Sequence, residues 1–199
     1  MKLSEQEIQH IRKMFSLMKS KEDFLSLLND IKKMLYGEKA TPFSMVQLNF
    51  HINPKLNPNR YLQFNIPKKN GGVRTINAPC RGLKQIQYCL NIVFQILHTP
   101  NHNAYGFLLN KSIVDNAQKH TGSIYVYNVD LKDFFSSIDQ SRVWGRLKYP
   151  PFCLNEKENR LGIANMIASL CCHEMVVERL NEQGDWIKMK KRVLMGLYE

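Results

Sequence analysis

The sequence predicts a mixed α/β (α+β) protein in which helices alternate with short strands. Three observations support this class. Capping signals precede amphipathic runs, β-branched and aromatic residues gather in short runs, and an Asn70-Gly71 step separates two of those runs. Helical spacing of apolar residues favours helices, β-branched runs favour strands, and Asn-Gly favours a tight hairpin turn.

The first 60 residues are expected to be helical and then irregular. Ser4-x-x-Glu7 is a capping box ahead of apolar residues at helical spacing. A second helix is predicted over residues 22–36, and Gly37 suits its end. Residues 40–60 contain three prolines and are predicted to be irregular.

The middle of the chain reads as a hairpin followed by helices. Residues 61–67 and 73–78 are predicted strands around the glycine turn. A helix is expected over 83–97, since its apolar residues recur every three or four positions. A short helix is predicted over 112–120.

The last third is predicted to combine strands with one helix. Residues 124–129 are β-branched and aromatic, which predicts a buried strand. Residues 158–172 are rich in Ile, Ala, Met and Leu and predict a helix. Residues 175–180 and 186–189 predict a second hairpin.

Charge indicates a nucleic-acid partner. The 199 residues carry a net charge of +11, and 44% are hydrophobic, which fits a folded protein rather than a basic tail. No Asp or Glu occurs from residue 39 to 114. A block of one sign attracts phosphates, and an acidic membrane surface is a distant second partner. The basic residues of this block are Lys39, Lys55, Arg60, Lys68, Lys69, Arg74, Arg81, Lys84 and Lys111.

Cysteine usage argues against disulfide and zinc frameworks. The five cysteines form an odd set without a Cys-x-x-Cys pair. Cys171-Cys172-His173 lacks a second ligand pair, so we expect these cysteines to be buried apolar residues. No apolar run approaches the roughly 20 residues that span a bilayer, and no signal peptide is evident. A cytoplasmic protein is expected.

Asp130 is the candidate catalytic residue. It follows the predicted strand 124–129, and a carboxylate there is costly unless it is solvated, paired or bound to a metal. Such an oxygen suits Mg²⁺. An ordinary turn or helix cap is the alternative reading. Asp133 is expected to be a turn or cap residue rather than a ligand.

The hairpin tip is the candidate phosphate-binding element. Lys68, Lys69 and Arg74 surround a two-glycine turn, where Arg offers a planar fork and Lys a mobile charge. Such a tip can close on a triphosphate. The alternative is a solvated basic hairpin.

Four blocks in order resemble bacterial reverse transcriptases of the retron and group II intron type. Residues 66–76 read Ile-Pro-Lys-Lys-x-Gly-Gly-x-Arg-x-Ile, and 79–87 read Pro-x-x-x-Leu-Lys-x-x-Gln. Residues 104–120 carry Ala-x-Gly-Phe, Ser-Ile and Asn-Ala-x-x-His, and 125–138 surround Asp130. The resemblance implies a right-hand polymerase, with N-terminal helices (1–60), fingers with the basic hairpin (61–122) and a partial palm (123–199).

The resemblance also implies roles for individual residues. Asp130 would be catalytic and would ligate Mg²⁺ or Mn²⁺ in a two-metal reaction, and Phe135 would exclude the 2′-hydroxyl of a ribonucleotide. The dNTP would contact Lys68, Lys69, Arg74, Leu131, Lys132, Asp133, Phe134 and Phe135. Nucleic acid would contact Arg60, Arg81, Lys84, Gln87, Asn116 and His120.

The second catalytic element of this family is missing. The family supplies further carboxylates from a Tyr-x-Asp-Asp turn after a Leu-Pro-Gln-Gly block, and this chain contains no Asp-Asp pair. We therefore expect the chain to be a truncated part that is inactive alone. A non-catalytic nucleic-acid-binding module and one half of a split polymerase are the alternatives.

The resemblance also implies the partners. An RNA template and a DNA or RNA primer are expected. If the enzyme is retron-like, the resemblance implies a cognate structured non-coding RNA as template and a role in antiviral defence. No membrane partner is expected. Self-association is possible through an exposed palm face.

Overall fold

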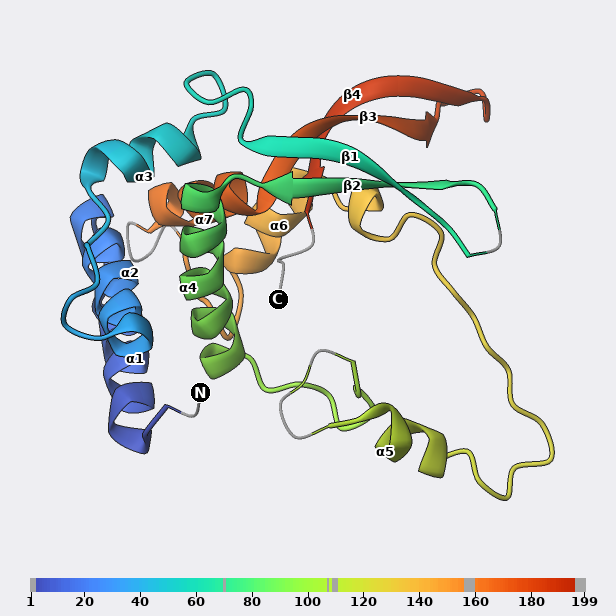
Figure 1. The fold of residues 1–199 in the computed structure, drawn as a ribbon, viewed down its shortest axis with the longest axis horizontal. Coiled ribbons are helices and arrows are strands. Elements are labelled where there is room, and N and C mark those ends of the chain that lie inside the picture. Colours follow the sequence, from blue (N-terminus) through green and yellow to red (C-terminus); the bar gives the residue numbers. More distant parts are fainter. Residues whose placement is uncertain (1–2, 70, 107, 109–110, 156–159, 196–199) are drawn as a thin grey trace.

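The computed structural model describes residues 3–69, 71–106, 108, 111–155 and 160–195 (Figure 1). It confirms a mixed helix and strand protein. The helices are α1 (Glu5–Leu17), α2 (Lys21–Tyr36), α3 (Met45–Ile52), α4 (Arg81–Leu97), α5 (Ile113–Gln118), α6 (Gln140–Leu147) and α7 (Leu161–Cys171), with a 3₁₀ turn η1 (Phe135–Ser137). The strands are β1 (Tyr61–Pro67), β2 (Val73–Pro79), β3 (Cys172–Leu180) and β4 (Trp186–Leu194).

Local capping explains where the N-terminal helices begin and end. The predicted capping box at Ser4 is confirmed, because its hydroxyl accepts from the Glu7 amide and the Glu7 carboxylate accepts from the Ser4 amide. Gly37 ends α2 at φ 80°, in the left-handed region that glycine favours.

Two short helices were not predicted. Helix α3 lies in the stretch 40–60 that the prolines suggested was irregular, and a capping box at Ser44 and Gln47 starts it. Helix α6 follows Asp139. Both are eight residues long, so their periodicity spans about two turns and gives a weak signal.

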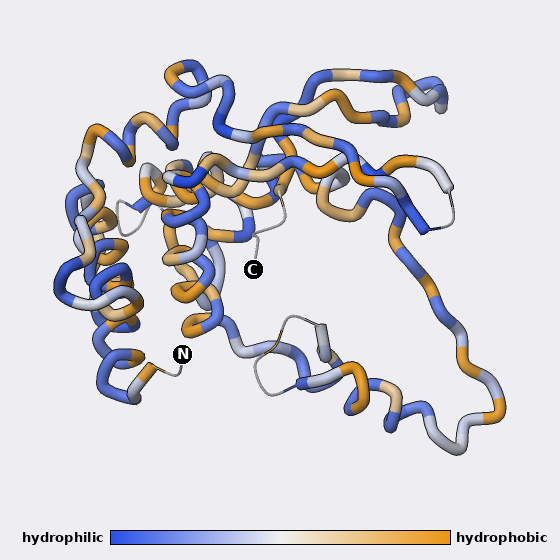
Figure 2. The backbone as a smooth tube through the Cα atoms, viewed as in Figure 1, coloured by the Kyte–Doolittle hydropathy of each residue, from blue (hydrophilic) through white to orange (hydrophobic). Residues whose placement is uncertain are grey.

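The core lies among α1, α2, α4 and α7. Fully buried side chains include Ile11 of α1, Leu28 of α2, Leu90 of α4 and Ile167 of α7. Figure 2 shows hydrophobic positions recurring along these helices at helical intervals. Burial of such side chains contributes about 1.5–3 kcal/mol each, so this four-helix region supplies most of the apolar stabilisation.

The strands form two separate antiparallel ribbons that extend from the helices (Figure 1). Strands β1 and β2 pair with Ile66 opposite Arg74, as the predicted hairpin requires. Strands β3 and β4 pair from Cys172 opposite Leu194 to Leu180 opposite Trp186. The second hairpin is thus longer than the predicted 175–180 and 186–189.

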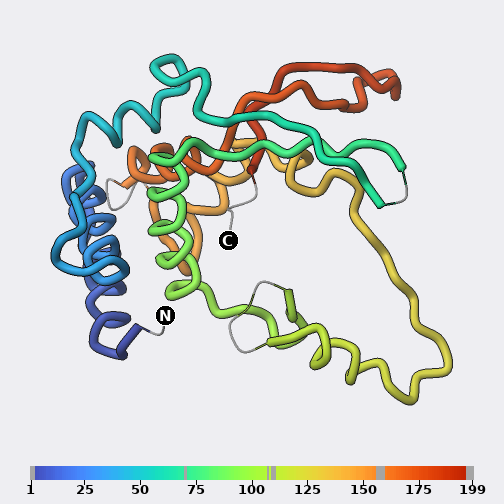
Figure 3. Tube along the Cα trace, in the orientation of Figure 1, coloured from blue at the N-terminus to red at the C-terminus, as the bar shows by residue number. Residues whose placement is uncertain are grey.

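The predicted strand at 124–129 is wrong in this structure. These residues form no strand, and Tyr125 and Tyr127 are each 91% exposed. Figure 3 traces this yellow segment as a single extended chain that returns from α5 toward η1. The side chains suit a buried strand, but a strand also needs a neighbouring backbone to pair with. The described residues offer none.

The predicted helix 158–172 corresponds to α7, whose described part begins at Leu161. Its first two predicted residues lie outside the described residues, as do Asn70 of the hairpin tip, Phe107 of the Ala-x-Gly-Phe block and residues 196–199. A search of the described helices finds none with the length and hydropathy needed to cross a bilayer.

The buried cysteines predict a loss of stability at alkaline pH. Cys89, Cys171 and Cys172 are buried free thiols, as expected from the sequence. Burial raises the pKa of Cys89 and of Cys172 to about 12, and it also raises the pKa of Cys171. An unfolded thiol has a pKa of about 8.5. The stability is therefore fully present below about pH 8.5 and is lost as pH rises toward the folded values.

Between pH 7.5 and 9.5 the free energy of unfolding should fall by about 1.4 kcal/mol for each buried thiol. Urea unfolding at the two pH values measures this change. Cys89→Ala should reduce this pH-dependent loss of unfolding free energy by the contribution of one thiol. Cys80→Ala, at a half-buried site, is the control. An equal free energy of unfolding at both pH values would contradict the prediction.

Candidate active site and nucleic-acid interface

The β1–β2 hairpin presents exposed cations around a glycine turn. Lys68, Lys69 and Arg74 are exposed, and none has a hydrogen-bonding or ionic partner within the described part of the chain. The Lys68 amide donates to the Gly72 carbonyl at 3.1 Å, and both turn glycines have a φ near 80° (79° and 83°). The turn thus needs glycine at these positions, and it leaves the three cations available for phosphates.

Exposed apolar side chains accompany these cations. Leu62 is 63% exposed, Phe64 50% and Val73 60%. An exposed apolar and basic surface of this kind suits the mixed chemistry of nucleic acid, whose bases stack and whose phosphates carry charge.

Asp130 lies on the extended segment rather than at a sheet edge. Its carboxylate is exposed, as are Leu131 and Lys132 next to it. The structure therefore gives Asp130 the solvent access that a metal ligand requires. It does not give the rigid strand that the sequence suggested, because residues 124–129 are unpaired.

The residues after Asp130 form a defined turn. Asp133 has φ 54°, and its carbonyl accepts from the Ser137 amide at 2.9 Å and from the Ser136 hydroxyl at 3.0 Å. This confirms Asp133 as a turn residue. Phe134 and Phe135 are about half exposed and meet edge to face, with ring centroids 5.4 Å apart. The turn thus holds two aromatic rings at the surface.

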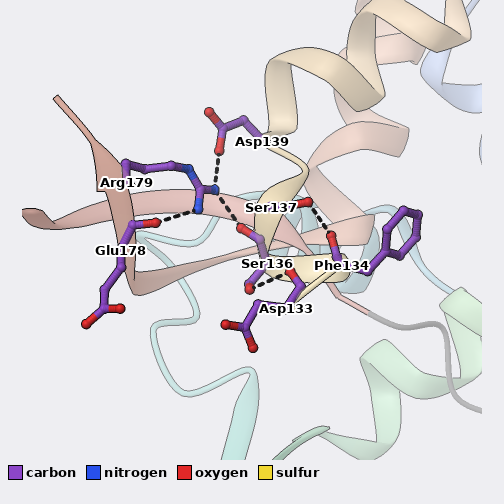
Figure 4. A network of polar contacts seen from close by, with 7 residues as sticks. All are labelled: Asp133, Phe134, Ser136, Ser137, Asp139, Glu178 and Arg179. Atoms are coloured by element: carbon purple, nitrogen blue, oxygen red, sulfur yellow. Dashed lines mark hydrogen bonds and ion pairs between the residues drawn. The ribbon is translucent and has the colours of Figure 1, made fainter. Parts of the chain in front are cut away.

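Arg179 fastens this turn to the β3–β4 hairpin (Figure 4). Its guanidinium donates to the Ser136 carbonyl at 2.6 Å and to the Asp139 carboxylate at 3.0 Å. The Leu194 amide also donates to the Ile138 carbonyl at 2.8 Å. Sequence reasoning did not single out Arg179, because a lone arginine in a strand carries no motif.

Two predicted nucleic-acid contacts are enclosed in the protein. Arg60 is fully buried and donates to the backbone carbonyls of His51, at 2.8 Å, and of Cys172. Burial lowers the pKa of Arg60, although an arginine stays charged. The structure corrects this prediction: Arg60 joins the end of α3 to the start of β3 and does not reach a surface ligand.

Gln87 is corrected in the same way. It is 3% exposed, and its amide donates to the Tyr61 hydroxyl at 2.7 Å and to the Leu170 carbonyl at 2.8 Å. Burial raises the pKa of Tyr61 to about 12, so the phenol stays neutral. Gln87 thus joins α4 to β1 and α7.

The other predicted nucleic-acid contacts are at the surface. Arg81 and Lys84 are exposed at the start of α4, and Asn116 and His120 are exposed on and just after α5. Their contacts with nucleic acid stay predictions, as do the roles of Lys68, Lys69, Arg74 and the residues from Asp130 to Phe135.

Asp130 alone has the chemistry expected of a ligand to the implied Mg²⁺. An exposed carboxylate is the right chemistry for a hard cation. Within the described ranges, however, no three His, Cys, Asp or Glu residues gather into a group that could hold a metal ion. Asp130 can supply one ligand, but the described residues do not complete a metal site.

Comparison with known proteins bears on the family to which the chain is related. No protein-family model matches the chain. The retron Ec86 reverse transcriptase of Escherichia coli is 30% identical over 154 residues, which are 75% of this chain and 44% of that protein. The retron Mx162 reverse transcriptase of Myxococcus xanthus is 43% identical over 90 residues, 44% of this chain and 18% of that protein.

The chain is related to the retron reverse transcriptases. A further relative, the retron Ec73 reverse transcriptase of Escherichia coli, is 50% identical over 80 residues. The resemblance to retron enzymes that the four blocks indicated is thereby confirmed. The chain spans only 18% to 44% of the length of these retron relatives.

Proposed function

We propose that this chain forms the fingers and the first part of the palm of a retron-type RNA-directed DNA polymerase. The observation that carries the proposal is the 30% identity to the retron Ec86 reverse transcriptase over 75% of the chain. The exposed basic hairpin and the exposed carboxylate of Asp130 support it, because both are accessible to ligands.

In this proposal each surface has one task. The cations Lys68, Lys69 and Arg74 neutralise phosphates of the dNTP and of the RNA template. Asp130 would supply one oxygen ligand for Mg²⁺ or Mn²⁺ once carboxylates from outside this chain complete the site, and the bound metal would then supply the positive charge that nucleotidyl transfer needs. Phe135 lies beside the sugar and disfavours a 2′-hydroxyl. The partners are a primer and an RNA template, which for a retron-type enzyme is a cognate structured non-coding RNA.

The chain alone is proposed to be inactive. One carboxylate does not position two metal ions, and the sequence holds no Asp-Asp pair that could join Asp130. The remaining ligands would come from polypeptide outside this chain, either in the same protein or in a partner that completes a split polymerase.

A primer-extension assay tests both parts of the proposal. The chain alone, with primed RNA, dNTPs and Mg²⁺, should incorporate nothing. Addition of a polypeptide that carries Tyr-x-Asp-Asp should restore incorporation, which Asp130→Asn should abolish. Glu182→Gln, at an exposed carboxylate in the turn between β3 and β4, should leave it largely intact. Incorporation by the chain alone that depends on Asp130 would refute the inactivity.

The second candidate function is a non-catalytic RNA-binding module, which the unpaired cations of the β1–β2 hairpin favour. It predicts salt-sensitive RNA binding. It also predicts no incorporation with any added polypeptide, which separates it from the polymerase.

A further inference from the structure

A cavity of about 370 Å³ lies between α2, α3 and the start of α4. This volume is within the usual range of small-molecule sites. Its lining is rich in hydrogen-bond donors and contains no Asp or Glu. Its polar lining includes the side chains of Lys32, His51 and Arg81 and the backbone of Gly82.

Lys32 is the first sign of an anionic ligand. Its side chain is 9% exposed and lines the cavity, and Nζ lies 3.9 Å from the centroid of the Phe43 ring. Within the described part of the chain, no carboxylate and no carbonyl is within hydrogen-bond or ion-pair distance of this ammonium. The stem of Lys32 is thus buried, while its ammonium has only an aromatic face beside it and can take an anionic partner in the cavity.

The start of α4 adds positive potential to the same cavity. Helix α4 has 17 residues, its N-cap Cys80 makes no side-chain capping bond, and its first turn has no acidic residue. Its first residue is instead Arg81, a cation at the positive end of the helix dipole. That placement is unfavourable unless an anion lies nearby.

His51 forms one wall of the cavity, with its Nε2 edge against Gly82. Its Nδ1 lies 3.3 Å from the amide nitrogen of Asn57. Because an amide nitrogen only donates, a neutral His51 carries its proton on Nε2. Burial and the charge of Arg60 lower the pKa of His51, which favours this neutral form. A Cβ at Gly82 would lie 2.6 Å from Nε2, so glycine lets the imidazole approach the first turn of α4.

We propose that this cavity is a phosphate-binding site, in which Lys32, Arg81 and the first amides of α4 hold the anion. The phosphate belongs either to a nucleic-acid backbone or to a free nucleotide. With a backbone phosphate the inference rests on the proposed function, because Arg81 is one of the predicted nucleic-acid contacts. The cavity contains neither Asp130 nor the basic hairpin, so phosphate binding and polymerisation can be tested separately.

Inorganic phosphate is the first probe, titrated into the ¹⁵N-labelled full chain. The Gly82 and Arg81 amide signals should shift and saturate. Lys32→Met keeps the stem and removes the charge, and it should weaken binding about tenfold or more. Lys33→Met is the matched control, since it removes the neighbouring charge, which is paired at the surface with Glu38. Arg81→Gln, at an exposed position, tests the site if Lys32→Met does not fold.

Two further titrations identify the source of the phosphate. If a single-stranded oligoribonucleotide competes with phosphate at Gly82, and Lys32→Met weakens RNA binding, the site holds a backbone phosphate. If AMP competes and RNA affinity is unchanged in Lys32→Met, the site holds a free nucleotide. Amide shifts that do not saturate, or that are the same in the parent, Lys32→Met and Arg81→Gln, overturn the proposal.

Discussion

Replacement of Arg60 by alanine is expected to lower the free energy of unfolding by roughly 3 kcal/mol or more. The guanidinium donates to two carbonyls, those of His51 and Cys172, which come from residues far apart in the chain. Each hydrogen bond from a charged donor contributes about 1.5–3 kcal/mol. The alanine variant leaves both carbonyls without this donor and opens a cavity as well.

Arg60→Met is the matched variant for this prediction. It keeps most of the buried stem and removes only the donors, so the difference between the two variants measures packing. Urea unfolding followed by circular dichroism gives both free energies. If both variants stay within about 0.5 kcal/mol of the parent, a range typical of surface substitutions, the guanidinium does not hold α3 to β3 as described.

Neutralisation of the hairpin in Lys68→Gln/Lys69→Gln/Arg74→Gln should weaken single-stranded RNA binding on the order of 100-fold at 0.1 M salt. Each lost phosphate contact removes about 0.7 from the slope of log affinity against log salt, so three contacts remove about 2. Fluorescence anisotropy across a series of salt concentrations measures both the affinity and the slope.

The matched control carries Lys13→Gln, Lys19→Gln and Lys188→Gln. These lysines are exposed on α1, just after α1 and on β4, and the variant loses the same net charge. An equal loss of affinity in both triple variants would mean that only net charge matters. The β1–β2 hairpin would then not be the RNA-binding surface.

The elements predicted well from the sequence are those with strong local signals. The capping box at Ser4, the glycine at position 37 and the glycine turn of the first hairpin each stabilise a local conformation without help from distant residues. The family resemblance likewise depends on short ordered blocks, and the retron relatives confirm it.

The errors concern features that depend on distant partners. Residues 124–129 have the composition of a strand, but composition does not reveal whether another backbone lies alongside. Arg60 and Gln87 were assigned to a nucleic-acid surface because of their residue type and motif position. Only the fold shows that both side chains are buried, where Arg60 donates to the Cys172 carbonyl and Gln87 donates to the Leu170 carbonyl.

The candidate catalytic residues lie on an extended segment that contributes little to the stability of the protein. No described residue from 94 to 146 is buried, so the core gains nothing from Asp130 or Phe135. Denaturation experiments will therefore report on the helices and will not detect changes at these two positions. A substitution there that alters catalysis at an unchanged melting temperature can be attributed to chemistry, without correction for the fraction of folded protein.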